Sequence, residues 1–322
     1  MISNKKIFIF GGSGSLGNKL IERYLKDNLI VNYSRDEAKH WKMGLKYKSD
    51  KISFIIGDIR DYNRVENSII RENPHIIIIA AALKHIDRCE YAVNECFMTN
   101  FMGPNNVLNA VEKNAAVLSN LECVCFISTD KACNAISAYG SAKFLGERIV
   151  CEKAFYLRGF KMNICRYGNV LNSNGSIIPA LHEKGLDPDC KEFTLTHEKM
   201  TRFVITLESA VDLLEHAILN AESGDIVIPT LVSMNVKDLF ELFSEKYNKP
   251  IRVTGLRSSE RLLETLISTT ESTSIVKNGN YYHIKPHYKH LVTSDEQREY
   301  NSDINPLTKE ELKDYLISLN LL

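Results

Sequence analysis

A tyrosine and a lysine four residues apart, Tyr139 and Lys143, have the spacing that most directly indicates chemistry in this sequence. Because they begin a helical pattern, we expect them to share one face of a helix. The ordinary pKa of a tyrosine is about 10, and a fixed ammonium nearby favours the phenolate. Tyr139 would then be a usable base near neutral pH. The alternative is that Tyr-x-x-x-Lys is an ordinary surface helix.

A second pair of candidate residues, Asp130 and Lys131, follows a buried strand predicted at Val124–Ser128. In open parallel sheets, ligands bind outside the carboxyl ends of the strands, which is where this pair would lie. A hydrolase triad is not indicated, because Ser128 and Ser141 have no histidine nearby.

A glycine-rich turn connects a strand predicted at Lys6–Phe10 to a helix predicted at Asn18–Lys26. This is the context that a dinucleotide-binding fingerprint requires. Gly11 permits the tight turn, Gly14 lets the backbone approach a pyrophosphate, and Gly17 lets the helix pack close to the strand. The helix N-terminus would face the negative charge. The spacing is G-x-x-G-x-x-G rather than G-x-G-x-x-G, and it still predicts a dinucleotide cofactor.

The end of the next predicted strand, Leu29–Tyr33, bears on which cofactor binds. An acidic residue at this point would bind a ribose diol and select NAD. Here Ser34 and Arg35 come first, and a hydroxyl with a guanidinium suits a 2′-phosphate. We therefore prefer NADP to NAD. The alternative is that Arg35 is a solvated turn residue.

Two further strands are predicted at Lys51–Ile56 and His75–Ala82, and each is followed by a helical pattern. Asp58, at the end of the first, could accept a hydrogen bond from an adenine amino group, or it could cap the helix predicted at Asp61–Arg71. Strands that alternate with helices in this way predict an α/β fold with a doubly wound parallel sheet.

Beyond a strand predicted at Met162–Arg166 the regular alternation weakens. We expect residues 1–165 to form the cofactor-binding domain, with a core that continues into the C-terminal half. Residues 166–322 would mainly form a smaller, interleaved substrate-binding lobe. Within it, Arg257-Ser-Ser-Glu260 is expected to precede a helix.

The composition excludes several classes of protein. Lys+Arg and Asp+Glu are both 40, so the net charge is zero and nucleic acid is not an expected partner. The longest apolar run, Ile76–Leu83, is too short to span a bilayer, and no signal peptide is evident. The eight cysteines form no C-x-x-C pair, which favours reduced thiols and a cytoplasmic location. No metal site is expected at His283, His287 and His290, because Pro286 interrupts their helical register.

Taken together, these residues resemble the extended short-chain dehydrogenase/reductase superfamily, which implies a Rossmann-type sheet. Within that superfamily the chain is similar, from about Lys6 to Leu266, to the inverting UDP-N-acetylglucosamine 4,6-dehydratases. The Asp130-Lys131 pair is the specific feature, since related dTDP- and GDP-hexose dehydratases carry Asp-Glu there and 4-epimerases carry neither. Ser258-Ser259 departs from the usual Pro-Gly, and Leu263 from the usual His. The matching motifs are Gly11-Gly-Ser-Gly-Ser-Leu-Gly17, Ser34-Arg-Asp-Glu37, Ala80-Ala-Ala-Leu-Lys84, Ser128-Thr-Asp-Lys-Ala132, Tyr139-Gly-Ser-Ala-Lys143, Arg166-Tyr-Gly-Asn-Val170 and Met200-Thr-Arg-Phe203.

The resemblance implies 4,6-dehydration of UDP-N-acetylglucosamine with inversion at carbon 5, giving a UDP-2-acetamido-2,6-dideoxy-L-hexos-4-ulose for surface glycan biosynthesis. Tyr139, with its pKa lowered by Lys143, would remove the 4-hydroxyl proton as NADP takes a hydride from carbon 4. Lys131, made neutral by nearby Lys143 and the nicotinamide, would remove the carbon-5 proton. Asp130, if protonated, would donate to the departing 6-hydroxyl. Thr129 completes the implied catalytic set.

The resemblance also implies which residues bind the ligands, and that NADP stays bound because each turnover regenerates it. A homo-oligomer, a dimer or larger, is expected to form through helices at Tyr91–Lys113 and Tyr139–Leu157. Alternatives are a dehydratase that retains the configuration at carbon 5, a 4-epimerase of a UDP-sugar and, more remotely, an NADP-binding sensor without catalysis. The implied cofactor-binding residues are Gly11, Gly14, Ser15, Leu16, Gly17, Ser34, Arg35, Asp36, Lys39, Asp58, Ile59, Ala80, Ala82, Lys84, Tyr139, Lys143 and Val170, and the implied UDP-sugar-binding residues are Lys84, Asn169, Arg202, Arg257 and Glu260.

Overall fold

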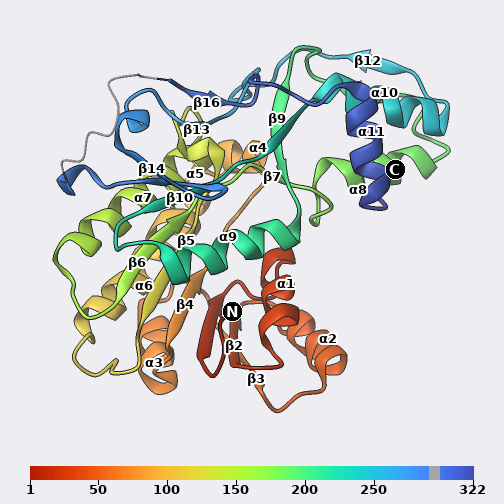
Figure 1. The fold of residues 1–322 in the computed structure, drawn as a ribbon. Helices are drawn as coiled ribbons and strands as arrows, with labels where there is room; N and C mark the ends of the chain where they lie inside the picture. The colour runs from red at the N-terminus through yellow and green to blue at the C-terminus, as the bar shows by residue number, and fades with distance from the viewer. Residues whose placement is uncertain (290–297) are drawn as a thin grey trace.

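A nine-stranded sheet is the centre of residues 1–289 and 298–322, the part of the chain that this computed structural model describes. Seven neighbouring strands run parallel, and two strands at one edge pair antiparallel (Figure 1). This arrangement confirms the predicted doubly wound sheet. From edge to edge the strands are β14 (Ile275–Asn278), β15 (Tyr281–Ile284), β10 (Ile226–Pro229), β6 (Lys161–Cys165), β5 (Cys123–Ile127), β4 (Ile76–Ile79), β1 (Lys6–Phe10), β2 (Leu29–Ser34) and β3 (Ile52–Ile56).

Helices cover both faces of this sheet and bury a core on each side (Figure 1). The four isoleucines of β4 are all buried and alternate between the two cores, as expected of a central parallel strand. On one face lie α3 (Tyr62–Glu72), α6 (Gly103–Lys113) and α7 (Ala138–Tyr156), and on the other lie α1 (Ser15–Tyr24), α2 (Glu37–Tyr47) and α9 (Leu207–Asn220).

A smaller lobe comes from the C-terminal half of the chain and has a core of its own, which includes Phe193, Leu239, Phe243 and Leu312. It is interleaved with the sheet, because β10, β14 and β15 belong to the same half of the chain. Its elements are β7 (Asn169–Val170), α8 (Ile177–Leu186), β8 (Phe193–Leu195), β9 (Thr201–Ile205), β11 (Val232–Asn235), α10 (Val236–Tyr247), β12 (Ile251–Val253), β13 (Thr265–Ile267), β16 (Tyr300–Asn301) and α11 (Lys309–Ser318). Single 3-10 turns are η2 (Asp130–Ala132), η3 (Glu271–Ser274) and η4 (His287–Lys289).

The helix predicted at about Tyr91–Lys113 is interrupted, and the strand predicted at His75–Ala82 ends early, at Ile79. One side chain connects the two segments. Asn100 lies in a π-helical turn, accepts from the Leu83 N–H at 2.7 Å and donates to the Leu83 carbonyl at 2.8 Å. The widened helix therefore holds the segment that leaves β4. The pieces are α4 (Ile86–Tyr91), α5 (Val93–Phe97), the π turn η1 (Met98–Met102) and α6.

The helix predicted after Arg257–Glu260 is wrong, because residues 257–264 form turns and loop before β13 begins. The Arg202 guanidinium donates to the carbonyls of Arg261 at 3.0 Å and Leu262 at 3.3 Å. Those carbonyls are the acceptors that a helix would need for its own backbone. Among residues 1–289 and 298–322, no helix combines the length and apolar character needed to cross a bilayer.

Candidate active site

The carboxyl end of β5 and the start of α7 bring the predicted catalytic residues together. Every residue of β5 is buried, and the chain then turns through η2, where the Thr129 hydroxyl accepts from the Lys131 N–H. Helix α7 begins at an N-cap, Ser137, whose side chain accepts from the Gly140 N–H at 3.0 Å. A Cβ atom on Gly140 would lie 2.2 Å from the Lys131 carbonyl oxygen, so this glycine lets α7 pack directly against η2.

The Lys131 amine has three acceptors around it. Its Nζ lies 3.0 Å from Asp130 Oδ1, 3.0 Å from Asn169 Oδ1 and 3.4 Å from Glu264 Oε1. Burial lowers the pKa of Lys131, but the two carboxylates outweigh burial and raise it above its ordinary value. The expectation that Lys143 makes this amine neutral is therefore wrong for the protein alone, in which Lys131 is an ammonium.

Asp130 is completely buried beside this ammonium. Its Oδ1 atom accepts from the Thr129 hydroxyl at 2.9 Å as well as from Lys131. Its Oδ2 atom has no hydrogen-bond partner among the described residues. A buried carboxylate oxygen without a partner is costly, which is typical of a group reserved for a ligand or a proton.

Tyr139 and Lys143 are both buried, but the electrostatic relation predicted between them is wrong. Burial raises the pKa of Tyr139 to about 12, and the groups that oppose this rise are the Lys131 ammonium and the Thr129 hydroxyl. Lys143 instead donates to the Ile127 carbonyl at 2.8 Å and lies 4.6 Å from the centre of the Phe126 ring. Burial lowers the pKa of Lys143 to about 8, although Glu147 opposes the shift.

The glycine turn after β1 has the geometry that the fingerprint predicts. Gly11 has a φ of +86°, and a Cβ there would lie 2.7 Å from the Ala81 nitrogen. A Cβ on Gly17 would lie 2.4 Å from Gly12, so α1 packs close to the turn. Helix α1 begins at Gly14, where no side chain caps the first amides. These N–H groups are available to an anion such as a pyrophosphate.

Other residues predicted to bind the cofactor lie at the start of α1, in the segments after β3 and β4, and in β7. Ser15 Oγ accepts from the Asn174 N–H at 3.1 Å, and Leu16 packs partly buried against the core. The Lys84 amine donates to the Asn174 carbonyl. Asn174, in the segment after β7, therefore connects Lys84 with Ser15. Ile59 is buried, Ala80 and Ala82 are half-buried in the segment after β4, and Val170 is half-buried in β7.

The polar residues after β2 form a hydrogen-bonded group. The Ser34 hydroxyl lies 2.9 Å from Ser13 Oγ and 2.6 Å from His40 Nε2. Arg35 is 54% exposed in its side chain and lies 3.6 Å from Asp58 Oδ2, so it is accessible to a further anion. Asp36 caps α2 by accepting from the Lys39 N–H at 3.0 Å, and the two side chains also form an ion pair.

Asp58 does not cap α3, because Asp61 fills that position. The Asp58 carboxylate instead accepts from the Arg60 guanidinium, at 3.0 Å from Nε and 2.7 Å from Nη2. Burial opposes ionisation, but these contacts hold the pKa of Asp58 below its usual range. The alternative that Asp58 caps this helix is therefore wrong, because the cap lies three residues later, at Asp61.

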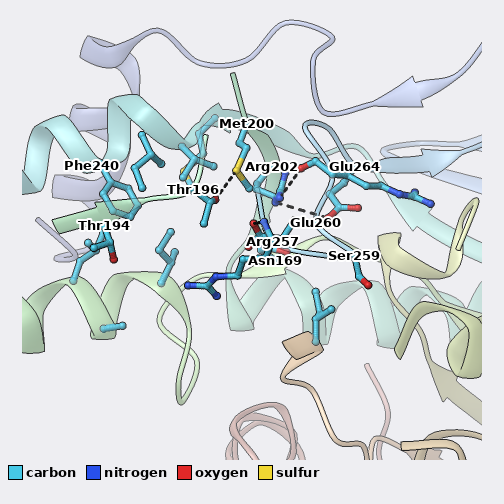
Figure 2. A pocket seen from close by; sticks show the side chains of 18 of the residues that line it. Asn169, Thr194, Thr196, Met200, Arg202, Phe240, Arg257, Ser259, Glu260 and Glu264 are labelled. Carbon is cyan, nitrogen blue, oxygen red and sulfur yellow. Dashed lines mark hydrogen bonds and ion pairs between the residues drawn. The ribbon is translucent and has the colours of Figure 1, made fainter. Parts of the chain in front are cut away.

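A cavity of about 370 Å³ opens from Lys131 towards the C-terminal lobe. Its walls include four of the five residues predicted to bind the sugar nucleotide, namely Asn169, Arg202, Arg257 and Glu260. Figure 2 shows Arg202 and Glu264 next to each other at one end and Thr194 with Phe240 at the other. Of the predicted set, only Lys84 is not among the described residues that line it.

Glu264 is the residue of this site that the sequence did not indicate. It is buried, it lines the cavity and it contacts Lys131. In the helix expected after Glu260, a glutamate is typical of an exposed position, so the local sequence did not indicate that Glu264 belongs to the site. Among the described residues no group of three or more His, Cys, Asp or Glu side chains is placed to hold a metal, and His290 lies outside those residues.

The chain is similar in sequence and in fold to known proteins. Residues 7–286 match the family described as polysaccharide biosynthesis protein. Over 333 residues the chain is 34% identical to a UDP-N-acetylglucosamine 4,6-dehydratase (inverting) of Campylobacter jejuni subsp. jejuni serotype O:2, covering 97% of this chain and 96% of the relative. It is also 34% identical over 343 residues to a UDP-glucose 4-epimerase of Rickettsia bellii, covering 99% and 97%. The X-ray structure of Pen from Bacillus thuringiensis is similar with a TM-score of 0.90 and 27% identity, covering 99% of both chains.

Proposed function

We propose that this chain, which belongs to the polysaccharide biosynthesis protein family, catalyses the 4,6-dehydration of UDP-N-acetylglucosamine with inversion at carbon 5. The products would be water and a UDP-2-acetamido-2,6-dideoxy-L-hexos-4-ulose. The observation that supports this reaction most strongly is the Lys131–Asp130 pair, an amine and a carboxylate 3.0 Å apart beside the cavity and close to Tyr139. Elimination of water needs a base and an acid side by side, and this pair supplies both.

A nicotinamide dinucleotide fits the glycine turn, because Gly11 and Gly17 leave room that a Cβ atom would fill and no side chain caps the first amides of α1. When bound, it supplies a hydride acceptor for carbon 4 that can return the hydride to carbon 6. Ser34 and Arg35 favour NADP over NAD, since a hydroxyl and an accessible guanidinium suit a 2′-phosphate. We propose that the cofactor is held by the cofactor-binding residues predicted from the sequence, from Gly11 to Val170.

Tyr139 is the proposed base for the 4-hydroxyl proton. The Lys131 ammonium and the Thr129 hydroxyl both favour its phenolate against the effect of burial. Lys143 fixes the end of β5 through the Ile127 carbonyl and adds positive charge on the same side of α7. With its pKa lowered to about 8, Lys143 remains mostly protonated at neutral pH.

Proton transfer within the Lys131–Asp130 pair would prepare the elimination. Lys131 can remove the carbon-5 proton only after it has lost one of its own, and Asp130 Oδ1 is 3.0 Å from its Nζ. Transfer to Asp130 gives a neutral amine and a protonated carboxyl in one step. The amine is then the base for carbon 5, and the carboxyl is the acid for the departing 6-hydroxyl.

The substrate would lie in the cavity with its sugar at Lys131 and its diphosphate and uridine towards the C-terminal lobe. We propose that Asn169, Arg202, Arg257 and Glu260 bind it from the walls and that Lys84 approaches from the cofactor side. Residues 1–165 would then mainly bind the cofactor, and residues 166–322 mainly the sugar nucleotide. Guanidinium groups suit a diphosphate because they form paired hydrogen bonds with its oxygens.

A homo-oligomer is proposed from the surface of the helices beside the site. Large apolar side chains are exposed along α4, α5 and α7, although such side chains are normally scattered singly on a monomer. A second copy of the same helices would cover them. The exposed residues include Tyr91, Val93, Phe97, Phe144 and Leu145.

The test is incubation of the purified protein with UDP-N-acetylglucosamine and no added cofactor, followed by NMR of the product. A 4-keto-6-deoxy sugar nucleotide is expected from the wild-type chain, and none from Lys131→Ala. If neither protein forms such a product, or if both form it at the same rate, the proposal is wrong.

Epimerisation at carbon 4 of a UDP-sugar is the second candidate, because the Rickettsia relatives with that name are as similar in sequence. An epimerase has no need for the Lys131–Asp130 pair, since no water leaves the sugar. Mass spectrometry of the product distinguishes the two reactions. Loss of one water supports dehydration, and an unchanged mass with a new sugar configuration supports epimerisation.

A further inference from the structure

Glu264 is a buried carboxylate with no role in the proposed reaction steps. Its Oε1 atom lies 3.4 Å from Lys131 Nζ and 3.7 Å from Arg202 Nε. Its Oε2 atom has no hydrogen-bond partner among the described residues. Its backbone is held on both sides, since the Glu264 N–H donates to Ser302 Oγ at 2.9 Å and the Ser302 N–H donates to the Glu264 carbonyl at 2.8 Å.

Arg202 connects this carboxylate to the cavity wall. Its Nη1 donates to the Thr201 carbonyl at 2.7 Å, and its Nη2 donates to the Arg261 carbonyl at 3.0 Å. The guanidinium is buried and therefore fixed in one orientation. Figure 2 shows Arg202 and Glu264 adjacent at the end of the cavity. The carboxylate thus lies between a rigid cation on one side and the Lys131 amine on the other.

We propose that Glu264 is a positioning residue that orients the Lys131 amine for proton removal at carbon 5, a role that rests on the proposed function. An ammonium has three N–H donors, and Lys131 donates hydrogen bonds to Asp130 and Asn169 and forms an ion pair with Glu264 at 3.4 Å. After Asp130 takes a proton, the neutral amine keeps two N–H bonds: one donates to Asn169, and the other can turn towards Glu264 Oε1, 3.4 Å away. Those two contacts together would fix the direction of the lone pair.

Four charged or titratable groups face the Lys131 amine from the elements packed around it. They are Asp130 on η2, Tyr139 on α7, Arg202 on β9 and Glu264 before β13. Asp130 and Glu264 favour the ammonium and Arg202 opposes it. Removing the charge of Glu264 alone should make the amine easier to deprotonate but leave it less well oriented.

The first experiment measures the amine itself. Competitive labelling with acetic anhydride over a range of pH, read by peptide mass spectrometry, gives the pH at which Lys131 is half protonated. Glu264→Gln should lower that pH by about 1 unit. Glu260→Gln is the matched control, because it removes a carboxylate from the same cavity without contacting Lys131, and it should leave the value unchanged. An unchanged value in Glu264→Gln would overturn the proposal, and this result does not depend on turnover.

The second experiment separates the two proton transfers in a single turnover with UDP-N-acetylglucosamine. Glu264→Gln should reduce the bound nicotinamide at nearly the wild-type rate, because Tyr139 acts at carbon 4. Exchange of the carbon-5 hydrogen with deuterated water should slow by on the order of tenfold. Glu264→Asp, which keeps the charge at a longer distance, should restore part of that rate and is the variant to use if the amide does not fold.

Equal slowing of both steps in Glu264→Gln would show a merely structural role and would overturn the positioning role. A wild-type protein that neither reduces its nicotinamide nor loses water would instead contradict the proposed function. In that case the labelling result would still report on the Glu264–Lys131 contact.

Discussion

Two cations, the buried Arg166 and the partly buried Lys131, each lie between two carboxylates, and the difference between them separates structure from chemistry. All five N–H donors of Arg166 are used, two with Glu147, two with Glu271 and one with the Leu266 carbonyl, at 2.6–2.9 Å. Around Lys131, by contrast, one oxygen of Asp130 and one of Glu264 have no partner among the described residues.

The two clusters also differ in what lies beside them. The Arg166 cluster joins β6, α7 and the segment around η3, and none of its three charged residues is among those that line the cavity. Lys131 and Glu264 both line it. A saturated network holds elements together, whereas an unsaturated one next to a cavity keeps hydrogen-bonding capacity for a substrate. The following predictions test that distinction, beginning with the largest effect.

Lys131→Met should lower the rate of dehydration about 10³-fold, because it removes the base for carbon 5. Its effect on folding should be smaller than that of losing Arg166, since Asp130 keeps the Thr129 hydrogen bond and Glu264 keeps Arg202 as a counter-charge. Product formation and urea unfolding on the same preparation check both statements. If Lys131→Met unfolded at a much lower urea concentration than wild type, the Lys131 cluster would stabilise the fold as the Arg166 cluster does, and the distinction would be wrong.

Arg166→Met should lower the free energy of unfolding by about 3–5 kcal/mol, because it leaves the buried Glu147 without a counter-charge and Glu271 with only the more distant Arg148. Urea unfolding at neutral pH measures the loss. Arg148→Met is a matched control, since Arg148 follows Glu147 on α7, is more exposed than Arg166 and reaches Glu271 only at 3.6 Å. A loss below about 1 kcal/mol for Arg166→Met would mean that the network is worth no more than a surface ion pair.

The pH dependence of stability should report the saturated cluster. Burial opposes ionisation of Glu271, but Arg166 and the Ser268 contacts lower its pKa from 4.5 to about 2. Because the folded pKa is the lower one, the stabilisation is complete above about pH 4.5 and is lost as the pH falls towards about 2. Urea unfolding at pH 6 and pH 3 should show this loss in wild type, and a smaller one in Glu271→Gln. Equal losses in both proteins would contradict it.

The smallest predicted effect concerns the backbone of the cavity wall. Ser259 lines the cavity with a φ of +69°, in the left-handed region that favours glycine. Ser259→Gly should therefore raise the free energy of unfolding by about 0.5–1 kcal/mol. Ser258→Gly is the control, because its φ is not positive, and it should be neutral or destabilising. A higher melting temperature for Ser259→Gly than for Ser258→Gly would support backbone strain at Ser259, and a lower one would exclude it.

The sequence predicted the sheet and the cofactor turn well because their signals are local. The buried strands, the glycines of the turn and the Tyr139–Lys143 spacing depend on neighbours within one or two turns of chain. The segment after Glu260 was mispredicted as a helix because Arg202, far away in the sequence, takes its carbonyls.

The charge states at the site could not be predicted for a related reason. Glu264 helps to raise the pKa of Lys131. The two residues are far apart in the sequence, so no local sequence pattern predicts their contact. The pKa of Tyr139 is raised by burial, which no residue spacing reveals, and Lys143 turns towards the Ile127 carbonyl instead. Residue types thus indicated which groups meet, and the three-dimensional surroundings decided which of them hold protons.

The most direct test of the central role given to Lys131 and Asp130 is the reaction of UDP-N-acetylglucosamine in deuterated water, with NMR of carbon 5 in the product. Wild type should give a 4-keto-6-deoxy product with deuterium at carbon 5 and inverted configuration, and Lys131→Met should give almost none. Hydrogen kept at carbon 5 in the wild-type product, or full deuteration with Lys131→Met, would contradict the assignment of Lys131 as the base.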